Sequence, residues 1–169
     1  MPTHIALLRA INVGGTGKLP MTELRALCEG LGFANVRTYI QSGNVVFESR
    51  LSSKRVKAEL EGALEARLGK RHAALLRSLE EMAEVEARNP FPEADPKQLL
   101  VVFLDAAPPR DALKAVKIPG RERLLLDGRE LFIHFPDGMG RSKLKVPFAA
   151  TGTGRNLNTI RALLRLAVP

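Results

Sequence analysis

The chain lacks the residues that build covalent cross-links and aromatic stacking surfaces. Its 169 residues include one cysteine, Cys28, one tyrosine, Tyr39, and no tryptophan. A single cysteine excludes an intrachain disulfide and a cysteine-based metal cluster. Because Leu24, Leu27 and Leu31 surround it at helical spacing, we predict that Cys28 is a small buried hydrophobe with a protonated, unreactive thiol.

Long hydrophobic runs and a secretory leader are also missing. No apolar stretch in the sequence approaches the ~20 residues that a membrane-spanning helix needs. The N-terminus has no basic leader with an apolar stretch and a cleavage site, so we expect a cytoplasmic protein without a membrane partner. The composition, 45% apolar and 26% charged, is that of an ordinary globular protein.

Acidic residues are absent from both ends of the chain. Segments 1–22 and 138–169 contain no Asp or Glu, and the second of them carries six Lys and Arg residues. A pI near 10.1 predicts attraction to phosphate groups in general. Arginine-rich coding is the alternative, because 17 Arg against 9 Lys can raise the pI without any partner.

The apolar pattern predicts two halves with a shared order of strand, helix, hairpin and helix. In the first half the predicted strands are 4–13, 35–40, 44–48 and 72–76, and the first predicted helix is 21–31. A second helix is predicted to begin at a cap formed by Ser52 or Ser53 and to end at Gly69, and a third to begin at a capping box of Ser78 and Glu81 and to end before Asn89. In the second half the predicted strands are 98–104, 123–126 and 130–135, and the predicted helices are 109–116 and 157–167. Asp127-Gly128 is a strong two-residue hairpin signal.

This order predicts the fold class. A strand–helix–strand–strand–helix–strand unit is the ferredoxin-like plan. We therefore expect an α+β protein of two intertwined ferredoxin-like halves, residues 1–90 and 91–169, with antiparallel sheets and packed helices. The first strand of each half is apolar on both faces, whereas a lone ferredoxin-like sheet leaves one face in water. This indicates that the halves pack together, and one compact unit is the alternative to two separate halves.

Motifs along the whole chain resemble those of a bacterial family known as domain of unknown function 1697 (DUF1697). The matching segments are 6–15, 19–21, 37–47, 89–91, 140–144 and 153–159, in the order the family has them. The resemblance implies a fold of two intertwined ferredoxin-like halves and implies no activity, cofactor or catalytic residue. Members usually read Ala-Arg-Asn-Trp-Asn-Thr near the end, whereas this chain has Gly154 and Leu157 in place of the Ala and Trp. An aromatic that stacks on a ligand would be lost here, and one that only packs would be largely replaced by Leu157.

The segment 12–18 is the first candidate for ligand binding. It follows a predicted strand and precedes a predicted helix, as a phosphate-binding loop would. A P-loop would need Gly where Asn12 stands and Ser or Thr where Leu19 stands, so a nucleoside triphosphatase is excluded. Successive glycine N–H groups could still hold an anion, and a connector with positive φ is the alternative. The candidate residues are Asn12, Gly14, Gly15 and Lys18.

The tip of the first hairpin is a second candidate. Gln41, Ser42 and Asn44 gather hydrogen-bonding side chains there. Turn chemistry alone accounts for Ser42 and Asn44. Gln41 is not a typical turn residue, so a binding role for the tip stays open beside the turn interpretation.

The basic tail carries the strongest candidates: Arg141, Ser142, Lys143, Arg155 and Asn156. They lie in Gly-rich stretches, and glycines let a ligand approach the backbone. Arginine pairs in a forked manner with phosphate or carboxylate, and a helix beginning near Asn156 would offer free N–H groups. The alternative is that Asn156 only caps this helix.

Metal and nucleophile chemistry find little support. His4, His72 and His134 stand in predicted strands without converging ligands, so no metal site is predicted. Ser142 beside Lys143 is no nucleophile pair, since adjacent side chains usually diverge. The sequence therefore assigns no reaction, no cofactor and no general base.

Three functions stay open. The first is binding of a small anionic or phosphorylated ligand, with or without catalysis. The site would lie where the Gly14–Lys18 loop, the Ser42–Asn44 tip and the tail meet. The second is RNA binding through the backbone phosphates, although so few aromatics make a poor base-stacking platform. The third is a non-catalytic interaction module whose charge is incidental.

Overall fold

The computed structural model describes residues 1–12, 18–40 and 43–168. The chain divides into two units, each described here by itself. Unit 1 comprises residues 1–83 and 162–169, and unit 2 comprises residues 84–161. The chain thus leaves unit 1 at Ala83 and returns to it at Ala162.

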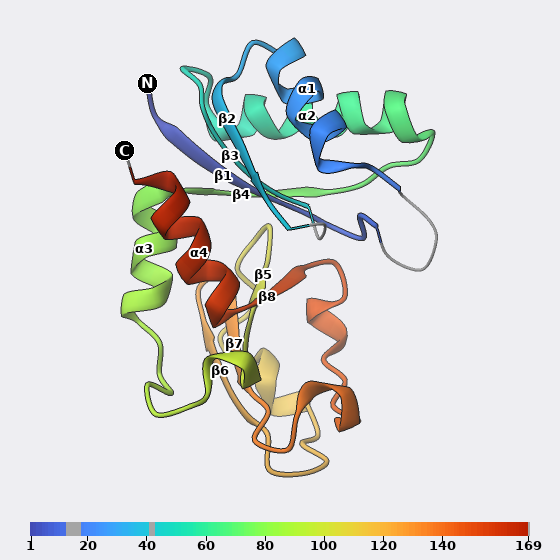
Figure 1. Ribbon diagram of the computed structural model, residues 1–169. Helices are drawn as coiled ribbons and strands as arrows, with labels where there is room; N and C mark the ends of the chain where they lie inside the picture. The colour runs from blue at the N-terminus through green and yellow to red at the C-terminus, as the bar shows by residue number, and fades with distance from the viewer. Residues whose placement is uncertain (13–17, 41–42, 169) are drawn as a thin grey trace. The chain divides into compact units, whose positions relative to one another are not determined.

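Unit 1 has a four-stranded antiparallel sheet with two long helices on one face (Figure 1). The strand order is β2-β3-β1-β4. The elements in chain order are β1 (Thr3–Leu8), α1 (Met21–Gly30), β2 (Ala34–Tyr39), β3 (Asn44–Glu48), α2 (Ser53–Leu68) and β4 (Ala74–Ser78), followed by α3 (Leu79–Ala87). This is the ferredoxin-like order.

Local chemistry sets the helix ends in unit 1. The Ser52 hydroxyl accepts a hydrogen bond from the Arg55 N–H at the start of α2, and Gly69 ends the helix in the left-handed conformation. At the start of α3, Ser78 and Glu81 bond each other's backbone N–H groups, the reciprocal pattern of a capping box. These three predictions are confirmed.

The core of unit 1 lies between the sheet and helices α1 and α2. Alternate strand residues such as Ala6 and Phe47 pack against Leu24 and Leu60 of the helices, as the strand period of two requires. Cys28 belongs to this cluster and is fully buried. The prediction that it is a buried hydrophobe is confirmed.

Unit 2 repeats the same sheet topology. Its strand order, β6-β7-β5-β8, corresponds to β2-β3-β1-β4 of unit 1, and each adjacent pair is antiparallel. The strands are β5 (Leu99–Phe103), β6 (Arg123–Asp127), β7 (Glu130–His134) and β8 (Thr153–Asn156), and the helix that follows them is α4 (Leu157–Ala167). The predicted fold class, α+β with two similar ferredoxin-like halves, is confirmed.

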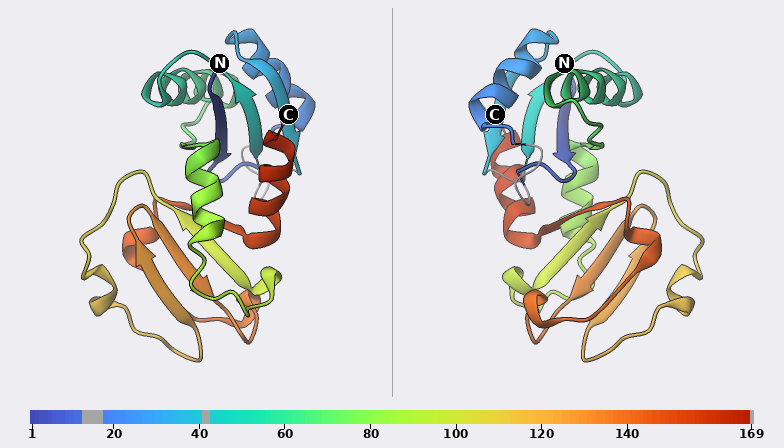
Figure 2. Two further views of the ribbon diagram at one scale, coloured as in Figure 1. Left: turned by 90° about the vertical axis from the view of Figure 1, so that its left-hand side faces the viewer. Right: turned by 90° about the vertical axis from the view of Figure 1, so that its right-hand side faces the viewer.

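Unit 2 differs from the sequence-based expectation in its helices. The helix predicted over 109–116 is wrong, because only a four-residue 3-10 helix, η2 (Ala112–Ala115), forms there. Pro108, Pro109 and Pro119 bracket a stretch too short for a stable α-helix. The other short 3-10 helices are η1 (Pro96–Gln98), η3 (Met139–Arg141) and η4 (Pro147–Ala149). Figure 2 shows these loops and turns around β6 and β7.

The short turns of unit 2 take the place that α1 and α2 have in unit 1. The sheet side of the core is formed by residues such as Val102, Leu131 and Ile133. Leu113 in η2 and Phe148 in η4 pack against it. Strand β8 was not predicted, and it completes the sheet beside β5.

Candidate functional site

Asn12 and Asn44, two of the candidates in unit 1, form side-chain hydrogen bonds with the main chain. The Asn12 amide donates to the Leu19 carbonyl oxygen at 2.9 Å and accepts from the Leu19 N–H at 2.8 Å. Asn44 is fully buried and donates to the carbonyl of Tyr39 at 2.9 Å, which closes the β2–β3 hairpin. Lys18 is exposed. Gly14, Gly15, Gln41 and Ser42 lie outside the described residues.

Arg155, in the tail, is buried in strand β8. Its side chain donates to the Thr153 hydroxyl at 2.7 Å and to the Gly154 carbonyl at 2.9 Å. Burial lowers the pKa of the Arg155 guanidinium to about 10, because an ion away from water loses hydration. Arg155 is 7% exposed, so its charge faces little solvent.

The tail glycines near Arg155 let two strands approach each other. A Cβ on Gly152 would lie 2.6 Å from the Phe103 carbonyl oxygen, and one on Gly154 would lie 3.0 Å from the Leu100 side chain. Both contacts are with strand β5, the neighbour of β8. Close packing of β8 on β5 therefore explains these glycines without a ligand.

The start of α4 is capped by the chain itself. The Asn156 side-chain oxygen accepts from the Thr159 N–H at 2.9 Å, the geometry of an N-cap. Leu157, which stands where the family usually has Trp, is 2% exposed and so packs in the interior.

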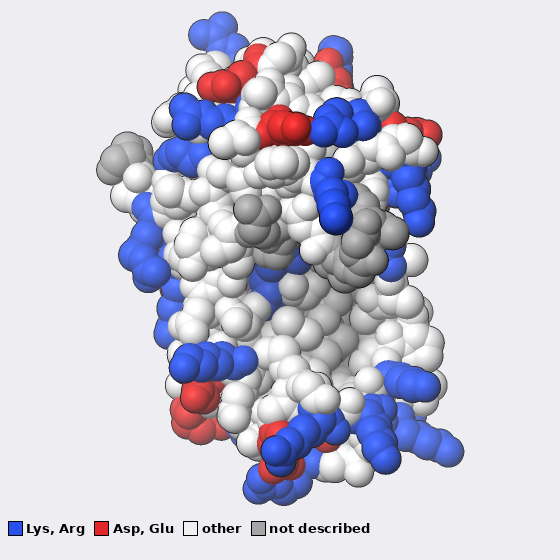
Figure 3. All heavy atoms as spheres, turned by 45° about the vertical axis from the view of Figure 1, so that its right-hand side comes forward, with Lys and Arg blue, Asp and Glu red and all other residues white. Residues whose placement is uncertain are grey.

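Lys and Arg side chains are spread over the face drawn in Figure 3, with Asp and Glu side chains among them. The six basic residues of the tail have different surroundings. Arg155 is buried, Arg161 bonds Glu86 at 2.9 Å, and Arg165 is exposed. Arg141 and Lys143 line a pocket.

This pocket lies in unit 2, at the open end of the β6–β7 hairpin. Arg123 pairs with His134 in the register, so the segment before β6 and the segment after β7 are neighbours. The pocket has a volume of about 200 Å³. It is lined by Pro119, Gly120, Glu122, Phe135, Asp137, Gly138, Arg141, Ser142 and Lys143.

Gly138 turns the chain out of β7 into the pocket wall. Its φ is +91°, a conformation that costs a residue with a Cβ free energy. The turn is closed by the Gly138 N–H, which donates to the Phe135 carbonyl at 3.0 Å. Phe135 is 7% exposed and also belongs to the core of unit 2, so one wall of the pocket is anchored in packed structure.

The pocket contains two carboxylates in different situations. Asp137 forms an ion pair with Arg121, whose Nε donates to it at 3.1 Å. Hydrogen bonding to Arg121 lowers the pKa of the Asp137 carboxyl and raises that of the Arg121 guanidinium. The charge of Asp137 is thus already matched by a neighbouring cation.

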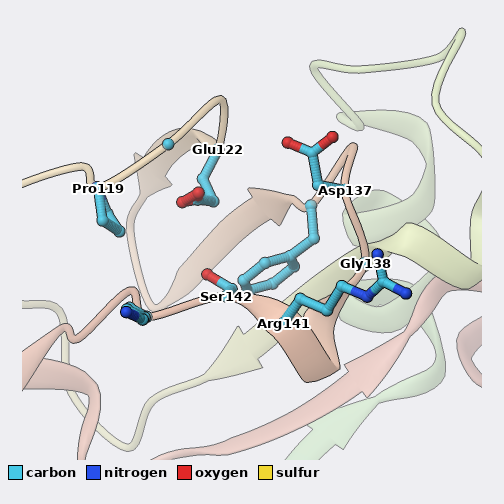
Figure 4. Close-up of a pocket in the computed structure, with 9 residues that line it drawn as sticks. Pro119, Glu122, Asp137, Gly138, Arg141 and Ser142 are labelled. Carbon is cyan, nitrogen blue, oxygen red and sulfur yellow. The ribbon is translucent and has the colours of Figure 1, made fainter.

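Glu122 has no such partner for one of its oxygens. Its Oε2 is shielded from solvent and has no hydrogen bond from the residues that the structure describes. A shielded acceptor without a donor costs about 1–3 kcal/mol, and more when it is charged. In Figure 4 the Glu122 side chain points across the pocket towards Ser142.

The opposite wall carries cations and a hydroxyl. Arg141 and Lys143 are exposed, and within the described ranges no hydrogen bond or ion pair engages either of them. The Ser142 hydroxyl accepts from the Leu144 N–H at 3.1 Å, which fixes the oxygen and leaves its proton free to be donated. Figure 4 shows the Arg141 side chain running along the Gly138 side of the pocket.

A metal site and a membrane-spanning helix are both missing from the part of the chain that the structure describes. No group of three or more His, Cys, Asp or Glu side chains there is placed to hold a metal ion. None of the described helices is both long and apolar enough to cross a bilayer.

The structure brings three of the predicted site residues together, Arg141, Ser142 and Lys143. Sequence reasoning missed Glu122 and Asp137 on the same pocket. The hairpin signal points to the neighbourhood of these residues, and the observed two-residue loop, Gly128-Arg129, one residue beyond the predicted Asp127-Gly128, sets the register that makes residues 122 and 135 neighbours. That the Gly14–Lys18 loop and the tail meet around one ligand stays a prediction.

Comparison with known proteins gives a family and a fold. The family model described as a protein of unknown function, DUF1697, matches residues 1–132. The structure is similar to that of the conserved bacterial protein SP0830 from Streptococcus pneumoniae, with a TM-score of 0.82 and 27% identity over 99% of each chain. No curated protein matches. The chain belongs to the DUF1697 family.

Proposed function

We propose that this protein binds a small molecule with an anionic group, carboxylate or phosphate, in the pocket at the open end of the β6–β7 hairpin. The observation that carries the proposal is the placement of Arg141, Ser142 and Lys143 on one wall of a pocket of about 200 Å³. Guanidinium, ammonium and hydroxyl donors are the groups that recognise phosphate and carboxylate oxygens.

The balance of charge in the pocket supports an anion. The Arg121–Asp137 pair is neutral as a unit. With that pair set aside, Arg141 and Lys143 outnumber Glu122, so the pocket together with Arg121 carries one net positive charge. An anion entering there meets two cations that have no other described partner.

The volume limits the size of the ligand. A cavity of roughly 150 Å³ holds one benzene molecule. The pocket, at about 200 Å³, therefore suits a metabolite of roughly ten non-hydrogen atoms. A whole nucleotide would extend out of the pocket.

The location of the protein is part of the proposal. Cys28 is a free, buried thiol, which is compatible with a reducing compartment. We place the protein in the cytoplasm on that basis.

The test is a binding measurement with matched variants. Thermal shift and calorimetry would be run with inorganic phosphate, small phosphorylated alcohols, small carboxylates and short single-stranded RNA. Arg141→Gln and Lys143→Gln should each weaken binding of the small anions about tenfold, the cost of one charge-assisted hydrogen bond.

The control is Lys145→Gln. Lys145 is exposed, lies two residues beyond Lys143 and does not line the pocket. It should bind small anions like the unaltered protein. Equal weakening in all three variants would show that general positive charge, and not this pocket, attracts the anion. A response to RNA alone would favour nucleic-acid binding instead.

A further inference from the structure

We propose that the ligand of this pocket is zwitterionic: its ammonium group pairs with Glu122 while its acidic group binds Arg141 and Lys143. The inference rests on the proposed function and adds the substrate class, a small amino-carboxylate or amino-phosphate compound. It follows from the separation of charge within one small cavity.

The first step is the state of Glu122. A pocket built only for an anion would not include a carboxylate that repels it. Glu122 nevertheless lines the pocket, and its shielded Oε2 accepts no hydrogen bond from the described part of the chain. A ligand ammonium supplies the missing donor and neutralises the charge at the same time.

The second step is the orientation of the carboxylate. The terminal torsion of a Glu side chain is broad and roughly two-fold. A small rotation therefore presents either oxygen to the pocket. Gly120 leaves room for this group, because a Cβ there would lie only 2.7 Å from Glu122 Oε1.

The third step excludes Asp137 as a second ammonium site. Asp137 is engaged by Arg121 through two guanidinium nitrogens. A ligand ammonium at Asp137 would therefore meet a carboxylate whose charge Arg121 already balances, together with the repulsion of the Arg121 cation. Glu122 is thus the carboxylate of this pocket that is open to a new partner.

The fourth step is the position of the acidic group. Arg141 and Lys143 belong to the segment after β7, and Glu122 belongs to the segment before β6. The carboxylate of Glu122 and the cations of Arg141 and Lys143 therefore stand on different walls, and the Arg121–Asp137 pair joins the two segments. A ligand that spans the pocket with one ionic group at each end satisfies both walls.

The experiment uses two pairs of compounds that differ by the replacement of an ammonium with a methyl group. The pairs are phosphoethanolamine with propyl phosphate, and β-alanine with butyrate. Calorimetry on the full chain should show that the zwitterion of at least one pair binds about tenfold or more tightly than its partner. The pair that shows this preference identifies whether the acid is a phosphate or a carboxylate.

A Glu122→Gln variant tests the residue itself. The amide keeps the shape and removes the charge, so the preference for the zwitterion should fall from about tenfold to near onefold. Binding of propyl phosphate or butyrate should become stronger, because the carboxylate that repels these anions is gone. A Glu122→Gln variant that keeps the full preference would overturn the inference.

The failures of the two proposals can be told apart. Equal binding of both members of each pair by the unaltered protein would overturn the zwitterion and leave the anion site standing. Absence of binding by all four compounds would overturn both.

A second variant reports on the position of Glu122 without altering its charge. Gly120 has no positive φ, so an alanine fits the backbone there. The added Cβ of Gly120→Ala would lie 2.7 Å from Glu122 Oε1 and displaces the carboxylate, so the preference for the zwitterion should drop several-fold. An unaltered preference in Gly120→Ala would contradict the proposed position of the Glu122 carboxylate.

Discussion

At the scale of single residues, Arg141 and Arg155 belong to the same basic tail but differ in their burial and in their partners. Arg155 is 7% exposed and bonds Thr153 and Gly154 within its own strand. Arg141 is exposed on the wall of a pocket. We therefore treat Arg155 as part of the fold and Arg141 as part of the site.

Replacement of Arg155 should destabilise the protein. In Arg155→Ala the Thr153 hydroxyl loses a donor and a buried side chain leaves a void, so the free energy of unfolding should fall by about 2 kcal/mol or more. Denaturant unfolding measures this. The exposed Arg165→Ala control should stay within ~0.5 kcal/mol. An Arg155→Ala protein of normal stability that cannot bind small anions would make Arg155 a ligand residue.

Because of Cys28, the free energy of unfolding should fall at alkaline pH. Burial, with a smaller contribution from Glu29, raises the pKa of its thiol from 9.0 to about 12. The folded protein then holds a proton that the unfolded chain releases, so this stabilisation is complete below pH 9.0 and is lost as the pH rises towards 12. The loss is at most about 1.4 kcal/mol per pH unit.

The measurement compares the unaltered protein with Cys28→Ala. The variant lacks the titrating thiol, so the difference between their free energies of unfolding should shrink as the pH rises above 9.0. A difference that stays constant across this range would show that the thiol does not titrate differently in the two states.

At the scale of elements, the β6–β7 hairpin decides where the site lies. The hairpin was predictable, but its turn lies one residue beyond the predicted Asp127-Gly128: Asp127 pairs with Glu130, so the two-residue loop is Gly128-Arg129, with Gly128 at φ +61°. This register pairs Arg123 with His134 and brings the two pocket segments together. The sequence signal therefore locates the hairpin, and the register that completes the pocket comes from the structure.

Other elements were not predictable because their cause is distant in sequence. Strand β8 contains Thr153, Gly154, Arg155 and Asn156, which on their own are typical of a loop. They form a strand because β5, an apolar segment some fifty residues earlier, offers its edge. The local sequence carries no information about that edge. On its own it therefore leads to the interpretation of Gly152 and Gly154 as positions where a ligand approaches the backbone.

The close approach of β8 to β5 gives a test at this scale. Gly152→Ala would place a Cβ 2.6 Å from the Phe103 carbonyl oxygen, a backbone atom that cannot move aside cheaply. We expect a loss of about 2–4 kcal/mol of stability, measured by thermal or denaturant unfolding. Gly140→Ala is the control, because nothing lies within 4 Å of its added Cβ. Equal stability of the two variants would contradict the close packing of these strands.

At the scale of the whole molecule, the charge is large and dispersed. The net charge is +8, and Lys and Arg side chains are spread over the face in Figure 3, with smaller groups of Asp and Glu side chains among them. General attraction of polyanions is expected from such a charge. It differs from recognition in the pocket, where two cations and two carboxylates, one of them paired with Arg121, line a volume of about 200 Å³.

Salt separates the two kinds of binding. Association with single-stranded RNA releases several counterions, so its affinity should fall steeply as salt rises. A compound with one acidic group makes few ionic contacts, and its affinity should fall only slightly. Titrations at low and physiological salt test this. RNA binding that resists salt and is abolished by Arg141→Gln would point to nucleic acid as the ligand of the pocket.

Chemical-shift mapping of the ¹⁵N-labelled protein during titration with phosphoethanolamine tests the central claim most directly. Binding in the pocket predicts that the amide signals of Gly120–Glu122 and of Phe135–Lys143 move, except that of Pro136, which has no N–H. Signals of the buried β8 residues should stay in place, because Arg155 does not reach the ligand. Shifts centred on β8 or on the loop around Lys18, with the two pocket segments unchanged, would contradict the account.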